Sequence, residues 1–179
     1  MLFTHDTELA LSATAALVNT ARGDADGLPD VAALDAFAEQ WLVSYPRTRD
    51  QAELDAVRAL RPRLAPLWEM AEDDAAGLVN TLLRDASALP QLVKHDGWDY
   101  HIHATSQDTP LADRLAVDAA MAMADVIRTG ELVRLRYCAA DDCDDVLVDL
   151  SKNRSRRFCG LTCANRVNVA NYRSRRNAG

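Results

Sequence analysis

The stretch from Tyr137 to Arg176, YCAADDCDDVLVDLSKNRSRRFCGLTCANRVNVANYRSRR, contains every cysteine of the 179-residue chain. The cysteines form two close pairs, C-x4-C and C-x3-C, separated by fifteen residues: Cys138 and Cys143, then Cys159 and Cys163. Each pair supplies two thiolates from one local turn, and the intervening loop lets the pairs meet around one tetrahedral ion. The spacing therefore predicts a four-cysteine site for Zn²⁺. Metal binding would contribute roughly 10–16 kcal/mol of folding free energy, which so short a segment with few apolar residues cannot obtain from a core.

The patterns around the cysteines predict a hairpin followed by a helix. The β-prone run Val146–Leu150 follows the first pair, so the flanking strands can form a hairpin whose tip holds Cys138 and Cys143. Cys159 and Cys163 stand at i and i+4, which places both sulfurs on one side of the first turn of a helix. This arrangement resembles a treble-clef finger. Because protein fills all four positions, no open position remains for an activated water, and the zinc is expected to be structural.

Charge is distributed unevenly along the chain. Residues 1–130 carry ten Lys and Arg against twenty-one Asp and Glu, a balance of −11, whereas residues 131–179 carry ten against six, a balance of +4. The last twenty-nine residues hold eight basic groups and no acid. An acidic body is repelled by phosphate and the basic tail is attracted, so the tail is expected to contact nucleic acid. The alternative is a solvated basic face.

Two groups of side chains in this tail are candidates for nucleic-acid contact. SKNRSRR packs four positive charges into seven residues, which is typical of a loop that positions phosphates. If a helix starts near Cys159, steps of about 100° per residue separate a metal-facing side, with Ala170 and Arg173, from an outward side. Asn and Arg match base edges, and a tyrosine ring can stack. The predicted contacts are Lys152, Asn153, Arg154, Arg156 and Arg157 in the loop, and Asn165, Asn168, Tyr172, Arg175 and Arg176 on the helix. Arg166 falls on the metal side, where it is expected to donate to a cysteine sulfur.

The first 130 residues have the pattern of a mostly helical domain with a small β element. Apolar residues recur at three and four residue steps, with Asp30 as a candidate N-cap and Pro62 expected to bend or restart a helix. Thr109-Pro110 opens a long helix that ends at Gly130. We therefore expect an α+β protein with domains 1–130 and 131–179, joined without a flexible linker, so that the finger packs close to the body.

One segment in the body alternates with a period of two, which predicts a strand after an Asp96-Gly97 turn. Its residues form a candidate ligand site: Trp98, Asp99, Tyr100, His101 and His103. Two histidines at i and i+2 occur as metal ligands, and they also occur as a polar sheet face, so both interpretations stay open. Neither a Gly-rich phosphate loop nor a nucleophile elbow occurs in the sequence, so we expect that the protein is not an enzyme.

The segment SKNRSRRFCGLTCANR resembles the CGNR zinc finger, with Cys163-Ala164-Asn165-Arg166 at the tetrapeptide that names the family and alanine in place of its glycine. The N-terminal part is similar to the ABATE domain, which precedes this finger in bacterial stress-induced transcription regulators. The similarity is clearest at Leu17–Thr20, LVNT, and at His95–Thr105. The resemblance implies a DNA-binding regulator of transcription in the stress response.

Together these features predict a DNA-binding transcription regulator in which the zinc finger contacts DNA and the body senses a signal or dimerises. One short finger reads too few base pairs for useful specificity. A twofold dimer would solve this problem, because it would present two basic helices to DNA. A homodimer and an unidentified small-molecule effector are therefore open as further partners. The sequence shows neither a secretory leader nor a membrane span, so we expect a cytoplasmic protein with no membrane partner. The alternatives are a zinc-stabilised protein-interaction module and an RNA-binding factor.

Overall fold

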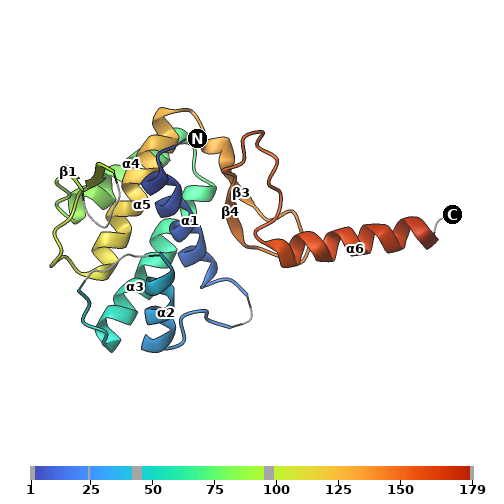
Figure 1. The fold of residues 1–179 in the computed structure, drawn as a ribbon, viewed down its shortest axis with the longest axis horizontal. Helices are drawn as coiled ribbons and strands as arrows, with labels where there is room; N and C mark the ends of the chain where they lie inside the picture. The colour runs from blue at the N-terminus through green and yellow to red at the C-terminus, as the bar shows by residue number, and fades with distance from the viewer. Residues whose placement is uncertain (1–2, 24, 42–45, 95–98, 178–179) are drawn as a thin grey trace.

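The computed structural model describes residues 3–23, 25–41, 46–94 and 99–177 (Figure 1). The body contains α1 (His5–Asn19), α2 (Val31–Trp41), α3 (Gln51–Leu64), the 3-10 turn η1 (Ala65–Trp68), α4 (Glu72–Asp85), β1 (Gln91–Val93), β2 (His101–His103) and α5 (Leu111–Arg128). The C-terminal part contains η2 (Leu132–Arg134), β3 (Leu135–Tyr137), β4 (Val146–Val148) and α6 (Leu161–Asn177). The predicted class, a mostly helical body followed by a small zinc-finger-like module, is confirmed.

Helix α5 is the centre of the body, and it packs against α1, α3 and α4. The small side chains of Ala116, Ala119 and Ala120 share one buried face of α5, which lets neighbouring helices approach it closely. The helix ends at the predicted place. Gly130 has φ of +67°, a left-handed conformation that glycine adopts without steric cost.

Helix α3 runs through Pro62, so the helix does not restart at this proline. Because Pro62 has no backbone N–H, the carbonyl of Arg58, four residues earlier, lacks its helical donor. The Nε of Arg61 donates to that carbonyl oxygen at 3.3 Å. The same guanidinium pairs with Asp26 at 2.6 and 2.9 Å, which fixes α3 against the loop that follows α1. The predicted N-cap at Asp30 is present, since its carboxylate accepts from Ala33 N–H at 2.8 Å.

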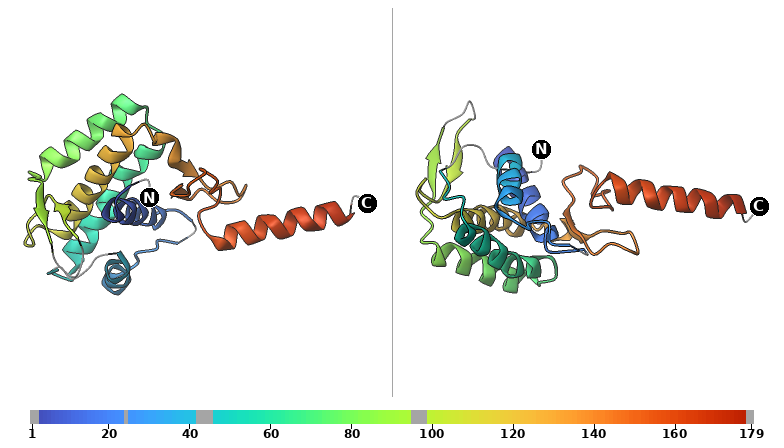
Figure 2. Two further views of the ribbon diagram at one scale, coloured as in Figure 1. Left: turned by 45° about the horizontal axis from the view of Figure 1, so that its top comes forward. Right: turned by 90° about the horizontal axis from the view of Figure 1, so that it is seen from below.

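Strands β1 and β2 form an antiparallel hairpin in which Leu92 lies opposite Ile102. The period-two pattern predicted β2, but it gave no indication of β1. Trp98 and the Asp96-Gly97 turn lie outside the described residues. The hairpin lies at the end of the body opposite α6 (Figure 2).

The second hairpin, β3–β4, joins the C-terminal module to the body. Val146, Leu147 and Val148 are all buried, and the two valines belong to the same apolar core as the helices. The indole Nε1 of Trp68 donates to the Leu147 carbonyl at 3.0 Å, and the Asn19 side chain both donates to and accepts from the Val146 backbone. The module therefore packs against the body, as expected from the absence of a linker.

Candidate metal centre and nucleic-acid interface

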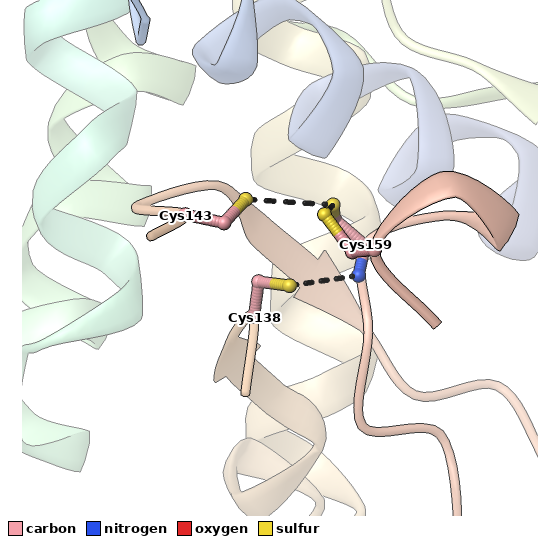
Figure 3. A group of neighbouring side chains, drawn as sticks. Cys138, Cys143 and Cys159 are labelled. Atoms are coloured by element: carbon pink, nitrogen blue, oxygen red, sulfur yellow. Dashed lines mark hydrogen bonds between the residues drawn. The ribbon is translucent and has the colours of Figure 1, made fainter. Parts of the chain in front are cut away.

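The two cysteine pairs come from a turn and from the start of a helix. Cys138 follows β3, where its N–H donates to the Asp145 carbonyl at 2.8 Å, and the Cys143 N–H closes the turn on Ala140 at 3.1 Å. Cys163 lies in the first turn of α6. Cys159 precedes this helix, which begins at Leu161 rather than at the predicted start near Cys159. Figure 3 shows Cys138, Cys143 and Cys159 pointing toward one another across the gap between the hairpin and α6.

The distances between the sulfur atoms fit a tetrahedral ion. The Sγ of Cys159 lies 3.7 Å from that of Cys143 and 3.6 Å from that of Cys163, and all four Sγ atoms lie within 4.8 Å of one another. Thiolates bound at about 2.3 Å to one tetrahedral Zn²⁺ are about 3.8 Å apart. A disulfide needs about 2.05 Å, and all four cysteines are free. The cluster is therefore built as a zinc site with four thiolate ligands.

Without a cation, this environment disfavours thiolates. Burial raises the pKa of Cys143 to about 11 and raises the pKa of Cys159 further. Cys138 differs, because N–H donors from Cys159 and Ala140 outweigh its burial and lower its pKa. A divalent cation supplies the positive charge that converts such thiols to thiolates. The donor set and its surroundings thus fit Zn²⁺ with a structural role.

Arg166 makes the contact expected of it. Its Nη2 lies 3.4 Å from the Sγ of Cys163 and 2.6 Å from Oδ1 of Asp142. The guanidinium therefore ties α6 to the acidic turn that carries the first cysteine pair, and it offsets part of the negative charge of a zinc tetrathiolate. The backbone N–H of Cys159 adds a donor to the Cys138 sulfur at 3.5 Å.

The loop between β4 and α6 is folded around a buried carboxylate that sequence reasoning missed. Asp149 is fully buried, and it accepts from the N–H groups of Ser151 and Arg156, both at 3.0 Å, and lies 3.2 Å from Nη1 of Arg136. Although burial raises it, these donors hold the pKa of Asp149 below its ordinary value. An Asp-x-Ser directly after a strand is a signal for this kind of turn.

Two of the predicted loop contacts are engaged within the chain. Arg154 pairs with Glu131 at 2.8 Å, and Arg134 donates to the same carboxylate at 2.7 Å. Arg156 donates to the carbonyls of Phe158 at 3.2 Å and Cys159 at 2.6 Å. These two arginines therefore shape the loop, although both remain exposed. The other predicted loop residues, Lys152, Asn153 and Arg157, are exposed, and the Arg157 guanidinium lies over the Phe158 ring.

Helix α6 extends away from the body as a single rod, and its C-terminal end lies far from the helical core (Figures 1 and 2). Every residue from 168 to 176 is exposed. Asn165, Asn168, Tyr172, Arg175 and Arg176 are accessible as predicted. Ala170 and Arg173, on the side predicted to face the metal, are exposed as well, so burial does not distinguish the two sides beyond Val167. The described part of the acidic body leaves residues 168–176 of α6 exposed.

Only some of the predicted ligand residues on the first hairpin lie close to one another. His101 and His103 face each other with 2.9 Å between their Nε2 atoms, and Tyr100 is exposed on the same hairpin. The Asp99 side chain is fully exposed beside Lys94, at 3.8 Å. Among the described residues, the four cysteines are the only group of three or more ligating side chains close enough to hold one ion. A second metal site at the histidines therefore has no third ligand in this part of the chain.

Comparisons with known families agree with this geometry. Residues 134–176 match the CGNR zinc finger, and residues 11–130 match the ABATE family, described as a "putative stress-induced transcription regulator". The second match covers well over half of the chain. The chain belongs to the ABATE family. This confirms the resemblance seen in the sequence, and the family description is that of a transcription regulator rather than an enzyme. No curated protein matches the chain. Within the described residues, we find no helix with the length and apolar character needed to cross a bilayer.

Proposed function

We propose that this ABATE protein regulates transcription by binding DNA through α6 and the loop at residues 151–157. The observation that carries the proposal is the exposed, projecting basic helix. Eight basic groups and no acid follow residue 150, while the body is acidic. A helix that buries no apolar face gains little stability from its own fold. Such a helix is best explained as a surface kept for a partner of opposite charge.

The dimensions of α6 suit a DNA groove. The part of the helix beyond Val167 contains ten residues, a length of about 15 Å. A helix with side chains is about 10–12 Å across, and the major groove of B-DNA is about 12 Å wide. Asn165, Asn168 and Arg175 supply amide and guanidinium groups of the kind that pair with base edges. Lys152, Asn153 and Arg157 are accessible for phosphate contacts from the loop.

A zinc ion bound by the four cysteines would have a structural role, holding this surface in place, and no catalytic role. It fixes the start of α6 against the β3–β4 hairpin, and that hairpin is packed into the core of the body through Val146 and Val148. The direction of α6 is therefore set by the body. A regulator of this kind acts in the bacterial cytoplasm, where the chromosome lies.

The body is proposed to sense a signal or to dimerise. One finger contacts too few base pairs for useful selectivity. Two copies related by a twofold axis would present two α6 helices to DNA, and a pocket in the body, described below, offers a place for an effector.

A salt series tests the proposal. Binding of the zinc-loaded chain to duplex DNA is measured by fluorescence anisotropy, with single-stranded RNA and heparin in parallel. Replacing Arg175 and Arg176 by Ala should weaken DNA binding and reduce the slope of log K against log salt by about 2. Replacing the exposed body arginines Arg63 and Arg84 by Ala removes the same charge and should leave the slope unchanged.

The same measurements separate the alternatives. Tighter binding to RNA would favour an RNA-binding factor, and equal binding to all three polymers would leave only attraction between opposite charges. If the Arg175/Arg176 variant binds DNA like the wild type while zinc content stays at one ion per chain, the proposed role of α6 is wrong.

A further inference from the structure

A pocket of about 440 Å³ is lined by residues of α1, α5 and the β1–β2 hairpin. Figure 1 shows the hairpin at the end of the body away from α6. Its walls are mainly apolar and include Leu9, Leu17, Leu115 and Met121. This volume and this lining are typical of sites for small organic molecules. The polar groups along the walls then decide which kind of molecule fits.

The hairpin brings large apolar side chains to the pocket without burying them. Leu92, Tyr100 and Ile102 line it, yet they are 69%, 71% and 47% exposed. A ligand with an apolar body would remove this clustered apolar surface from water, which is favourable in free energy. The Tyr100 ring also offers a face for stacking or for a cation.

The charged groups along the pocket are mainly negative. Of the described residues, three carboxylates, Asp6, Asp118 and Asp125, and one guanidinium, Arg128, line it. Asp125 is already engaged, since it accepts from Thr7 at 2.9 Å and lies 3.5 Å from Arg128. Within the described residues, neither Asp6 nor Asp118 forms an ion pair. These two carboxylates are therefore available to a ligand.

The two histidines cannot both be cationic. The 2.9 Å contact between the Nε2 atoms of His101 and His103 requires one ring nitrogen to accept, so at least one imidazole is neutral. Burial lowers the pKa of His103, against the opposing effect of Asp6, which favours its neutral form at pH 7.

Asp118 lies where its charge lacks full solvation. Its side chain is open to solvent within the pocket, but the surrounding protein desolvates the carboxylate and raises its pKa to about 6. The positive charge of Arg114 opposes this rise in pKa, and the negative charge of Asp6 adds to it. A cation placed beside Asp118 and Asp6 would offset both the poor solvation and the mutual repulsion.

We propose that this pocket binds a small organic cation, an amine with an aromatic or otherwise apolar body, whose ammonium group lies beside Asp118 and Asp6. The same two carboxylates disfavour a carboxylate or phosphate group at this position. A bare metal ion is excluded because the described residues offer no third ligand there. The inference concerns binding alone, and any effect of the amine on DNA binding rests on the proposed function.

Three indoles of similar size, with a cationic, a neutral and an anionic side chain, test the proposal. Tryptamine, indole-3-ethanol and indole-3-acetate are titrated into the full-length, zinc-loaded protein by calorimetry at pH 7.5, without DNA, and phenethylamine serves as a second amine. We expect the amines to bind, with tryptamine about tenfold tighter than the neutral alcohol and the acetate weakest. Asp118→Asn should remove that tenfold preference and leave the alcohol unchanged. Asp113→Asn, on α5 but outside the pocket, should change nothing.

The inference is overturned if neither amine binds, if the acetate binds best, or if Asp118→Asn leaves the preference intact. The unfolding midpoint and zinc content of each variant show whether it is folded. Because no DNA is present, failure of this experiment leaves the proposed function standing, and loss of DNA binding leaves this inference standing.

Discussion

Asn19 is expected to hold the zinc-binding module against the body, and replacing it should destabilise the whole chain. In the antiparallel β3–β4 pair, Val146 lies opposite Tyr137 at a position whose N–H and C=O point away from β3, because Cys138 N–H bonds to the next residue back, Asp145. Asn19 satisfies both groups, donating through Nδ2 to the Val146 carbonyl at 2.9 Å and accepting from the Val146 N–H at 2.8 Å.

The expected loss of unfolding free energy follows from the two Val146 backbone groups that Asn19→Ala leaves without a hydrogen-bond partner. Val146 is 1% exposed, so its two backbone groups would lose their partners in a place that water reaches poorly. Each unsatisfied buried group costs about 1–3 kcal/mol. Asn19 itself is half-buried, so some water enters, and we expect a total loss of about 2–4 kcal/mol.

Urea unfolding followed by tryptophan fluorescence measures this loss, and Trp68 reports on the interface directly because its indole bonds to Leu147. With a slope of about 2 kcal/mol/M, the midpoint should fall by roughly 1–2 M. Asn80→Ala, at an exposed position on α4, is the matched control and should change stability by less than about 0.5 kcal/mol. If the two variants have the same midpoint, or if the wild type unfolds in two separate transitions, the body and the finger do not form one cooperative unit.

Three further outcomes are expected. Trp68→Phe removes the donor to the buried Leu147 carbonyl and should lower the free energy of unfolding by about 1–3 kcal/mol in the same urea assay. Cys163→Ser should reduce zinc from one ion per chain to none by elemental analysis, whereas Ser155→Ala, in the loop, should retain the metal. Asp118→Asn should stabilise the protein by about 1 kcal/mol at pH 7.5, a value reduced for solvent contact. Since the folded-state pKa of Asp118 is raised to about 6, wild-type stability relative to this variant should rise as pH falls from 7 to 5. A constant difference across that range would contradict the poor solvation of the Asp118 carboxylate.

Features that depend on local spacing could be predicted from the amino-acid sequence. The four cysteines stand close enough in sequence that each pair meets in one turn, whatever the body does. The charge difference between body and tail is likewise a property of the chain, as is the stop of α5 at Gly130. Arg166 falls near the metal because three residues along a helix return to the same side. Each of these predictions needed only the geometry of a turn or a helix.

The contacts between distant parts of the chain could be seen only in the folded protein. No local pattern indicates that Glu131 engages Arg154, or that Asn19 completes the edge of β4, because those partners are 23 and 127 residues apart. Helical periodicity also divided α6 into two faces, although beyond Val167 no second surface covers the helix. Periodicity shows which residues can share a face, but the surface that meets that face is set by long-range packing. The pocket between α1, α5 and the first hairpin exists for the same reason, since three separate elements must be brought together before it can form.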